Sequence, residues 1–324
     1  MRNNKLFHEK EKPHVIAGSN ERGSESSLEE SVKSEQFSRI WSALITPMNE
    51  DESINYEALE RIVELQMQDG VEGFYCCGSS GEGLLLTLDE RKQVVEHVLK
   101  AVDGRVPVIS HVGTIRTKDV IELTRHAMSA GAMAVSMIPP YYYKFSMDEI
   151  ISYYEDVIRA VPGVPVIVYN IPQFTGVEFS KDNAGRLLSN RNIVGIKHTS
   201  TNLYALERIG QAFPGKALIN GFDEQLLGAL SMGACATIGT TVNLFAPLFQ
   251  KVRDAFQAGN MAEACHWQHA VNQRVEAAVK VGIFNAMKYG WTLRGVDCGA
   301  CRSPFRPLDE ASKRIVADLM EEKD

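Results

Sequence analysis

The sequence predicts an α/β protein with a (β/α)8 barrel fold and additional C-terminal helices. Eight short apolar runs occur along the chain, and a stretch with helical periodicity follows each of them. Each apolar run ends in polar or glycine-rich residues. Strict alternation of strands and helices is typical of a parallel sheet covered by helices. Eight such units over about 220 residues fit a closed barrel, in which the active site lies at the carboxyl ends of the strands.

The predicted strands are apolar runs of four or five residues, as expected for strands that are buried on both faces. In chain order they cover residues 40–43, 73–77, 108–111, 134–137, 166–169, 193–197, 217–220 and 235–239.

The predicted helices alternate with these strands. They occupy residues 58–69, 89–102, 117–130, 147–160, 181–188, 203–213, 224–232 and 244–258. Thr87 and Ser146 each precede acidic residues at the start of a helical pattern, which is typical of helix N-termini. Gly131 and Gly233 each follow a helical pattern directly, where helices commonly end.

A doubly wound open sheet is the alternative architecture. Its dinucleotide-binding signature, spaced glycines after the first strand, is missing around Thr46 and Pro47. We therefore expect the barrel to occupy residues 39–258. We expect residues 1–38 to form a polar, disordered or loosely docked tail, because they are rich in charged and small polar residues. Residues 259–324 are expected to form a helical extension packed on the barrel, with helices at 260–281, 283–289 and 311–322.

Composition narrows the class of protein. The chain has 324 residues, 44% of them hydrophobic, and a formal net charge of −7. Nucleic-acid binding would call for clustered Lys and Arg, so we expect no nucleic-acid partner. No apolar stretch reaches membrane-spanning length, so we expect no membrane partner. The N-terminal segment lacks the apolar core of a secretory signal, and its glutamates disfavour a transit peptide, so we expect a cytoplasmic protein.

Two groups of residues could be metal or redox sites. Cys298 and Cys301 form a CxxC pair, which is typical of a redox site or half a zinc site. No second CxxC exists, and the pair lies between predicted helices rather than at a strand-to-helix turn. Cys265, His266 and His269 fall within one helical turn and are either metal ligands or a polar helix face. We expect no metal at either place.

Lys197 is a charged residue at the end of the apolar strand 193–197. A buried ammonium group is costly unless it is paired, hydrated or shifted towards the neutral amine. Neutral lysine amines attack carbonyl substrates and form Schiff bases. The structural alternative is a lysine that extends from the strand end into water.

Two further features would lie at the same edge of the sheet. The loop Gly78-Ser79-Ser80-Gly81-Glu82-Gly83 follows the second strand. Glycines let backbone N–H groups approach an anion, and serine hydroxyls add donors. Because the loop lacks the lysine of a phosphate-binding loop, it favours a small carboxylic acid over a nucleotide. Tyr169 ends the fifth strand and is either a reactive phenol or an aromatic core residue.

Three motifs together resemble those of the dihydrodipicolinate synthase and N-acetylneuraminate lyase superfamily of Schiff-base aldolases. They are Gly78-Ser79-Ser80-Gly81-Glu82, Tyr169-Asn170-Ile171-Pro172 and Gly195-Ile196-Lys197. The resemblance extends from about Ser38 to the C-terminus. It implies a (β/α)8 barrel, assembly as a homotetramer, and pyruvate bound as an imine on the lysine.

Carried over residue by residue, the resemblance implies that Lys197 is the Schiff-base lysine and Tyr169 the proton-transferring phenol. Ser79 and Ser80 would hold the carboxylate of pyruvate. The family usually has threonine at position 80, so Ser80 keeps the hydroxyl and lacks a methyl. Tyr142 matches a rim tyrosine that would join Ser80 in a hydroxyl relay.

The segments after the last three strands resemble those that bind the polyhydroxy tail of sialic acid in the lyase branch. The substrate-binding residues implied there are Thr199, Gly221, Asp223, Glu224, Gly239 and Thr240. Phe222 and Thr240 stand where tyrosine and serine are frequent, so contacts there can differ. Phe174 stands where the synthase carries an arginine for its semialdehyde, and the lyase also lacks that arginine. Asp223 and Glu224 could instead be an acidic helix start.

We therefore predict a retro-aldol lyase that cleaves N-acetylneuraminate reversibly to pyruvate and N-acetylmannosamine. Its expected ligands are a keto-acid sugar and pyruvate. It would need no cofactor, because the covalent imine on Lys197 serves as the electron sink. The alternatives are a 2-keto-3-deoxy-sugar-acid aldolase, a dihydrodipicolinate-type synthase and a noncatalytic, regulatory barrel that binds sugar acids.

Overall fold

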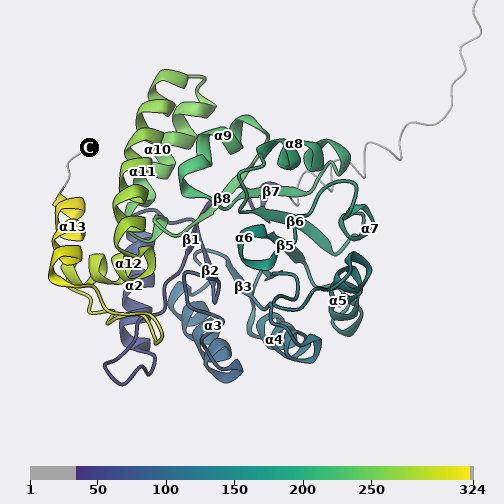
Figure 1. Cartoon of the computed structure of the whole chain (residues 1–324), viewed down its shortest axis with the longest axis horizontal. Coiled ribbons are helices and arrows are strands. Elements are labelled where there is room, and N and C mark those ends of the chain that lie inside the picture. Colours follow the sequence, from purple (N-terminus) through teal and green to yellow (C-terminus); the bar gives the residue numbers. More distant parts are fainter. Residues whose placement is uncertain (1–33, 322–324) are drawn as a thin grey trace, which may run out of the picture.

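The computed structural model describes residues 34–321, so most of the tail predicted at 1–38 lies outside the described residues. Eight parallel strands form a closed barrel in sequential order, β1 to β8, and β8 pairs with β1 (Figure 1). The predicted (β/α)8 barrel is confirmed. The strands are β1 (Ile40–Ala43), β2 (Gly73–Cys76), β3 (Val108–His111), β4 (Ala134–Met137), β5 (Val166–Asn170), β6 (Ile193–His198), β7 (Ala217–Asn220) and β8 (Ala236–Gly239).

Helices surround the barrel, as Figure 1 shows. They are α2 (Tyr56–Gln68), α3 (Leu88–Val102), α4 (Thr117–Ala130), α5 (Met147–Ala160), α6 (Pro172–Thr175), α7 (Gly185–Leu188), α8 (Leu203–Ala212), the 3₁₀ helix η1 (Asp223–Gln225), α9 (Leu226–Ser231) and α10 (Val242–Gln257). Thr87 and Ser146 cap α3 and α5 in full capping boxes, as predicted, and Gly131 ends α4 at a φ of 105°. No described helix is long and apolar enough to cross a membrane.

Two helices are shorter than the sequence predicts. The helix expected at 181–188 is reduced to α7, and residues 181–184 form a turn before it. This turn contains Asp182 and Asn183, which are poor helix formers. The helix expected at 224–232 is split into η1 and α9. The short helix α6, with Pro172 at its start, was not predicted.

The last barrel helix, α10, is kinked. Phe245 has non-helical dihedral angles, φ −126° and ψ 27°, and Pro247 follows two residues later. Proline is tolerated in the first turn of a helix because its missing N–H has no intrahelical acceptor there. The kink therefore restarts the helix just before Pro247.

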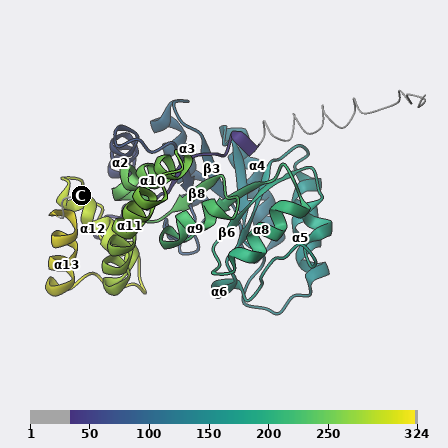
Figure 2. The ribbon, with the colours of Figure 1, turned by 90° about the horizontal axis from the view of Figure 1, so that it is seen from above.

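The C-terminal extension consists of α11 (Met261–Val281), α12 (Ile283–Leu293) and α13 (Glu310–Glu321). Figures 1 and 2 show these helices together on one side of the barrel, next to α10. One hydrophobic cluster includes Phe249 of α10, Val271 of α11 and Trp291 of α12. The extension therefore shares a core with the barrel, and it carries the turn between α11 and α12 to the mouth of the barrel cavity described below.

The interior of the barrel is filled by inward-facing side chains. At the amino end of the strands, Trp41 is fully buried and its Nε1 donates to the carbonyl oxygen of Phe37, at 3.0 Å. Phe37 itself is buried, although it falls in the segment predicted as a tail. Tyr75, Tyr169 and Ile219 belong to the same interior cluster. This packed layer is the floor below the carboxyl ends of the strands.

Candidate active site

Lys197 lies near the carboxyl end of β6, directly opposite Tyr169 of β5 in the parallel register. Its Nζ is 4.0 Å from the ring centroid of Tyr169 and 4.4 Å from that of Tyr75. The residue is only 4% exposed, and within residues 34–321 its Nζ makes no hydrogen bond or ion pair. A lysine that extends into water is thereby excluded. The amine lies at a buried aromatic surface and is available to react.

Neutral groups surround this amine from below. The hydroxyl of Tyr75 donates to Oγ of Ser136 at 3.1 Å, and its ring is edge-on to that of Tyr169. Burial raises the pKa of Tyr75 and keeps it a phenol. Burial also lowers the pKa of His111, and the positive charges of Arg91 and Lys197 add to this effect, so the imidazole is neutral. Within residues 34–321, no carboxylate forms a salt bridge with this lysine.

Tyr75 is a contact of the lysine that the sequence analysis missed. The strand Gly73–Cys76 is buried along its whole length. In such a strand the apolar pattern does not distinguish residues that face the barrel interior from those that face the helices. The aromatic side chain of Tyr75 within this strand was the sequence feature that could have indicated a contact with the lysine.

A cavity of about 200 Å³ opens above Lys197 at the carboxyl ends of the strands. It brings together nine of the residues named from the sequence: Ser79, Ser80, Tyr169, Lys197, Thr199, Gly221, Asp223, Glu224 and Thr240. Tyr169 and Lys197 lie at the carboxyl ends of β5 and β6, and the others lie in the segments that follow β2, β6, β7 and β8. Residues from the carboxyl ends of several strands usually form the catalytic face of such barrels.

The loop after β2 presents Ser79 and Ser80 to one side of the cavity. It is a tight turn in which the N–H of Gly83 donates to the carbonyl oxygen of Gly78 at 3.0 Å. A Cβ at Gly83 would lie 1.8 Å from the carbonyl oxygen of Cys77, so only glycine fits there. The hydroxyls of Ser80 and Thr240 are 2.7 Å apart and link this loop to the segment after β8.

Asp223 and Thr199 supply polar atoms to the opposite side. Oδ2 of Asp223 accepts from the N–H and the hydroxyl of Thr241, both at 2.7 Å. Among the described residues, Oδ1 of Asp223 and Oγ1 of Thr199 have no hydrogen-bond partner although both are buried. A Cβ at Gly239 would lie 2.0 Å from Oδ1 of Asp223, and one at Gly221 would lie 1.8 Å from Oγ1 of Thr199. Both glycines therefore make room for oxygens that a hydroxylated ligand could satisfy.

The pKa of Asp223 is raised to about 6. Burial is the main cause and the nearby Glu224 adds to it, while hydrogen bonds from Thr241 and the charge of Lys197 oppose the shift. Below about pH 6 this carboxyl group is protonated, and above it the carboxylate accepts hydrogen bonds fully. We expect KM for a polyhydroxylated substrate to fall as the pH rises from 5 to 7. Steady-state kinetics across this range check the expectation. In Asp223→Asn this fall should disappear, and a fall that persists there would assign the titration to another group.

Tyr142 is one of two predicted site residues that do not line this cavity. It is 86% exposed, has a φ of 74°, and packs edge-on against Tyr143 with ring centroids 5.1 Å apart. Its place in a hydroxyl relay stays a prediction, because no contact among residues 34–321 connects its phenol to Lys197. Gly239 does not line the cavity either, but it makes room for Asp223 as described above.

Part of the cavity wall comes from elements that the sequence analysis did not connect with the site. Val275, Val279, Ile283 and Phe284, from α11 and α12, form an apolar side. Phe174 of α6 lines the cavity as well and is 63% exposed. The apolar patterns of these helices predicted packing, and only the fold shows that part of each reaches the mouth of the barrel.

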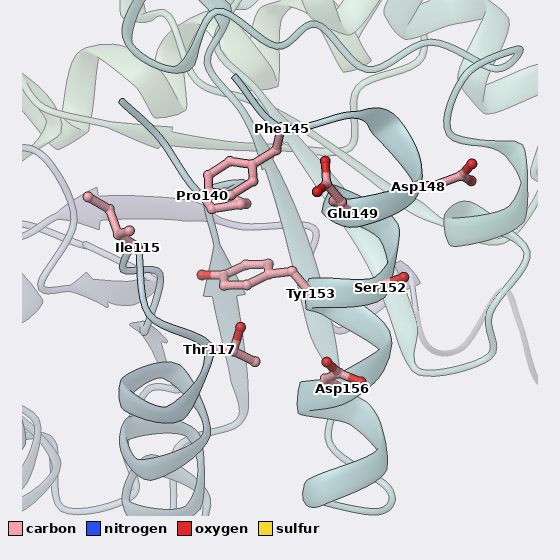
Figure 3. Close-up of a pocket in the computed structure, with 9 residues that line it drawn as sticks. All are labelled: Ile115, Thr117, Pro140, Phe145, Asp148, Glu149, Ser152, Tyr153 and Asp156. Atoms are coloured by element: carbon pink, nitrogen blue, oxygen red, sulfur yellow. The ribbon is translucent and has the colours of Figure 1, made fainter. Parts of the chain in front are cut away.

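A second hollow, of about 330 Å³, lies between the segment before α4 and the helix α5 (Figure 3). Figure 3 shows Phe145 beside Pro140 and the ring of Tyr153 reaching across from α5, while Asp148, Glu149 and Asp156 also come from α5. Glu149 is already used in capping α5. The hollow holds no basic side chain and none of the residues named from the sequence. It therefore lacks both the buried amine and the serine hydroxyls that the Lys197 cavity contains.

The structure does not favour a metal or redox site at either of the two groups of residues considered above. Within residues 34–321, no three His, Cys, Asp or Glu side chains are placed to hold a metal ion, so Cys265, His266 and His269 form no such site. Cys298 and Cys301 are both buried, and burial raises the pKa of each thiol to about 12. Protonated, buried thiols are poor nucleophiles and poor metal ligands.

Known proteins with similar sequences and structures were compared with this chain. The sequence profile of the dihydrodipicolinate synthetase family matches residues 36–323. An N-acetylneuraminate lyase of Rhizobium meliloti is 42% identical over 272 residues, which cover 84% of this chain and 90% of that protein. The crystal structure of N-acetylneuraminate lyase from Fusobacterium nucleatum superposes with a TM-score of 0.84 at 34% identity, covering 88% of this chain and 98% of that one. A dihydrodipicolinate synthase structure from Bacillus anthracis gives a TM-score of 0.85 at 27% identity, with coverages of 89% and 99%. The fold alone does not separate the two activities, whereas sequence identity is higher to the lyases.

Proposed function

The chain belongs to the dihydrodipicolinate synthetase family, and we propose that within it the protein is an aldolase that cleaves N-acetylneuraminate to pyruvate and N-acetylmannosamine. The observation that carries the proposal is Lys197, buried opposite Tyr169 at the floor of a cavity. That cavity has hydroxyls on one side and the carboxylates of Asp223 and Glu224 on the other.

The first step would be imine formation. After losing a proton, the amine of Lys197 attacks the keto carbon of the open-chain sugar acid, and water leaves as the C=N bond forms. The hydroxyls of Ser79 and Ser80 would hold the adjacent carboxylate of the substrate, since both line the cavity with Lys197. The protonated imine then withdraws electrons from the neighbouring carbons.

The second step would be cleavage. A base, either the phenolate of Tyr169 or the substrate's own carboxylate, takes the proton of the C4 hydroxyl. The C3–C4 bond breaks, its electron pair moves into the imine to give an enamine, and C4 becomes the aldehyde of N-acetylmannosamine. Protonation of the enamine and hydrolysis release pyruvate and restore the amine. Because the imine is the electron sink, the reaction as proposed uses no metal or other cofactor.

The cavity favours a neutral polyol over a second carboxylate. Among residues 34–321, Lys197 is the only basic side chain that lines it, and position 174 holds phenylalanine where a synthase would need arginine. A carboxylate buried without a partner costs several kcal/mol in order of magnitude. A dihydrodipicolinate-type synthase is therefore the weaker candidate.

We expect Glu224→Ala to lower kcat/KM for N-acetylneuraminate by about tenfold, because a hydrogen bond to a charged group contributes roughly 1.5 kcal/mol. Imine formation with pyruvate alone should be unchanged. Gln173→Ala, at another polar residue of the rim, is the matched control. If Glu224→Ala cleaves sialic acid at the native rate, or if aspartate semialdehyde is the better substrate, the lyase assignment is wrong.

A panel of keto-acid sugars assayed for pyruvate release tests the proposed substrate. N-acetylneuraminate should give the highest kcat/KM. A higher kcat/KM for 2-keto-3-deoxy-sugar acids would instead identify the protein as an aldolase of those acids. Binding of sugar acids without turnover would support the noncatalytic alternative.

We further propose a cytoplasmic homotetramer, by analogy with the family. Tyr142 and Tyr143 are 86% and 63% exposed and lie just before Phe145, which lines the hollow of Figure 3. Adjacent exposed aromatic rings are typical of a surface that another chain covers. Sedimentation of the full chain would determine the number of subunits.

A further inference from the structure

The loop that carries Ser79 and Ser80 is held from behind by a buried charge pair. Nζ of Lys288 lies 2.5 Å from Oε1 of Glu82, and both side chains are fully buried. Glu82 is in the same loop as the two serines, and its N–H donates to the carbonyl oxygen of Ser79 at 3.1 Å. Its φ of 56° lies in the left-handed region, which residues with a Cβ adopt only when other contacts hold them there.

Both groups of the pair have further partners in the C-terminal extension. The second carboxylate oxygen of Glu82 accepts from the N–H of Arg302 at 2.6 Å. Nζ of Lys288, on α12, also donates to the carbonyl oxygen of Ala300 at 3.0 Å. The loop is thus clamped by α12 and by the segment that follows it, which are outside the eight strands of the barrel.

Other ion pairs of the extension attach to helices instead of this loop. Arg302 pairs with Glu90 of α3, and Arg294 pairs with Asp69 at the end of α2. Among the ion pairs that the described part of the extension forms, only the Lys288 pair reaches the turn that presents hydroxyls to the cavity. An ion pair that only attached the extension to the barrel could lie at any of these places. The Lys288 pair instead involves Glu82, which is three residues after Ser79 and two after Ser80.

We propose that Lys288 is a positioning residue for the carboxylate of the keto acid, and this rests on the function proposed above. Its ammonium fixes Glu82, the turn of Glu82 fixes the backbone at Ser79, and Ser79 and Ser80 then meet the carboxylate of pyruvate. The C-terminal extension thereby sets the affinity of a site whose reacting lysine belongs to the barrel.

The test is the concentration of pyruvate that half-saturates borohydride trapping of the imine in the full chain. In Lys288→Met the ammonium is lost while the length of the side chain is kept, and Glu82 is left as a buried, uncompensated charge. Half-saturation should rise by about tenfold, because a displaced loop weakens binding of the carboxylate. The labelling rate at saturating pyruvate should stay within about a factor of two, because Lys197 itself is not moved.

Two further variants separate positioning from stability. Glu82→Gln combined with Lys288→Met removes both charges, so thermal stability should recover while half-saturation stays raised. Arg294→Met breaks an ion pair of the same extension that does not reach the loop, and it should keep native half-saturation. If Lys288→Met does not fold, the half-saturating pyruvate concentration is measured in the double variant instead.

The possible results distinguish this inference from the proposed function. If folded Lys288→Met or the double variant keeps the half-saturating pyruvate concentration of the native protein, the positioning role is wrong, and the proposed function is unaffected. A rise of the same size in Arg294→Met would also overturn it, since the effect would then come from docking of the extension. Absence of any trapped adduct in the native protein would overturn the proposed function and, with it, this inference.

Discussion

Lys197→Ala is expected to abolish release of pyruvate from N-acetylneuraminate, lowering kcat by at least about four orders of magnitude. Without the amine no imine forms, and none of the other side chains that line the cavity offers a basic nitrogen. A coupled assay for pyruvate at high enzyme concentration measures the loss. Lys181→Ala, which removes an exposed lysine, should retain the native rate.

The barrel itself should remain folded in Lys197→Ala. The amine has no ion pair or hydrogen bond within residues 34–321, so its removal leaves no buried partner uncompensated. Circular dichroism and thermal unfolding check this. A folded Lys197→Ala protein that still cleaves N-acetylneuraminate would rule out the imine mechanism.

The second large effect is expected for Tyr169→Phe. This change keeps the ring that lies 4.0 Å from Nζ of Lys197 and removes only the hydroxyl. Proton transfer by a positioned side chain contributes about 10²–10⁴-fold, so kcat for cleavage should fall by that amount. Imine formation with pyruvate should persist, because it requires only the amine and the carboxylate-binding loop. Rapid mixing followed by borohydride trapping separates the two steps.

Tyr75→Phe is the matched control for Tyr169→Phe, since both rings contact the same amine. It removes the hydrogen bond to Ser136 and should lower stability by about 1 kcal/mol, with a much smaller effect on cleavage. Equal losses of cleavage in the two variants would show that packing around Lys197, rather than the phenol of Tyr169, limits the rate.

Much of the barrel could be predicted because each strand and helix is a local pattern. Apolar runs and capping residues such as Thr87 and Ser146 lie in the same few residues that they define. The helix at 181–188 was predicted too long, because the apolar pattern extends over Asp182 and Asn183, which are poor helix formers. An apolar pattern alone does not weigh the helix propensity of the polar residues between its apolar positions.

The site could be predicted where a polar residue ends a strand, because the barrel gathers the strand ends at one face. Lys197, Tyr169 and the loop with Ser80 meet for this reason. Contacts between residues far apart in the sequence could not be predicted, because no local pattern connects Glu82 with Lys288. The same holds for the apolar wall from α11 and α12. Tyr142 marks a different limit, since one chain alone gives its phenol no partner in the site.

The most direct test of the central claim is to treat the native protein with pyruvate and borohydride and to map the product by peptide mass spectrometry. Only an imine gives a reductively stable adduct between pyruvate and a lysine. The account predicts one adduct, on Lys197, with N-acetylneuraminate producing the same label. An adduct on another lysine, or none at all, would contradict the claim that Lys197 is the Schiff-base nucleophile.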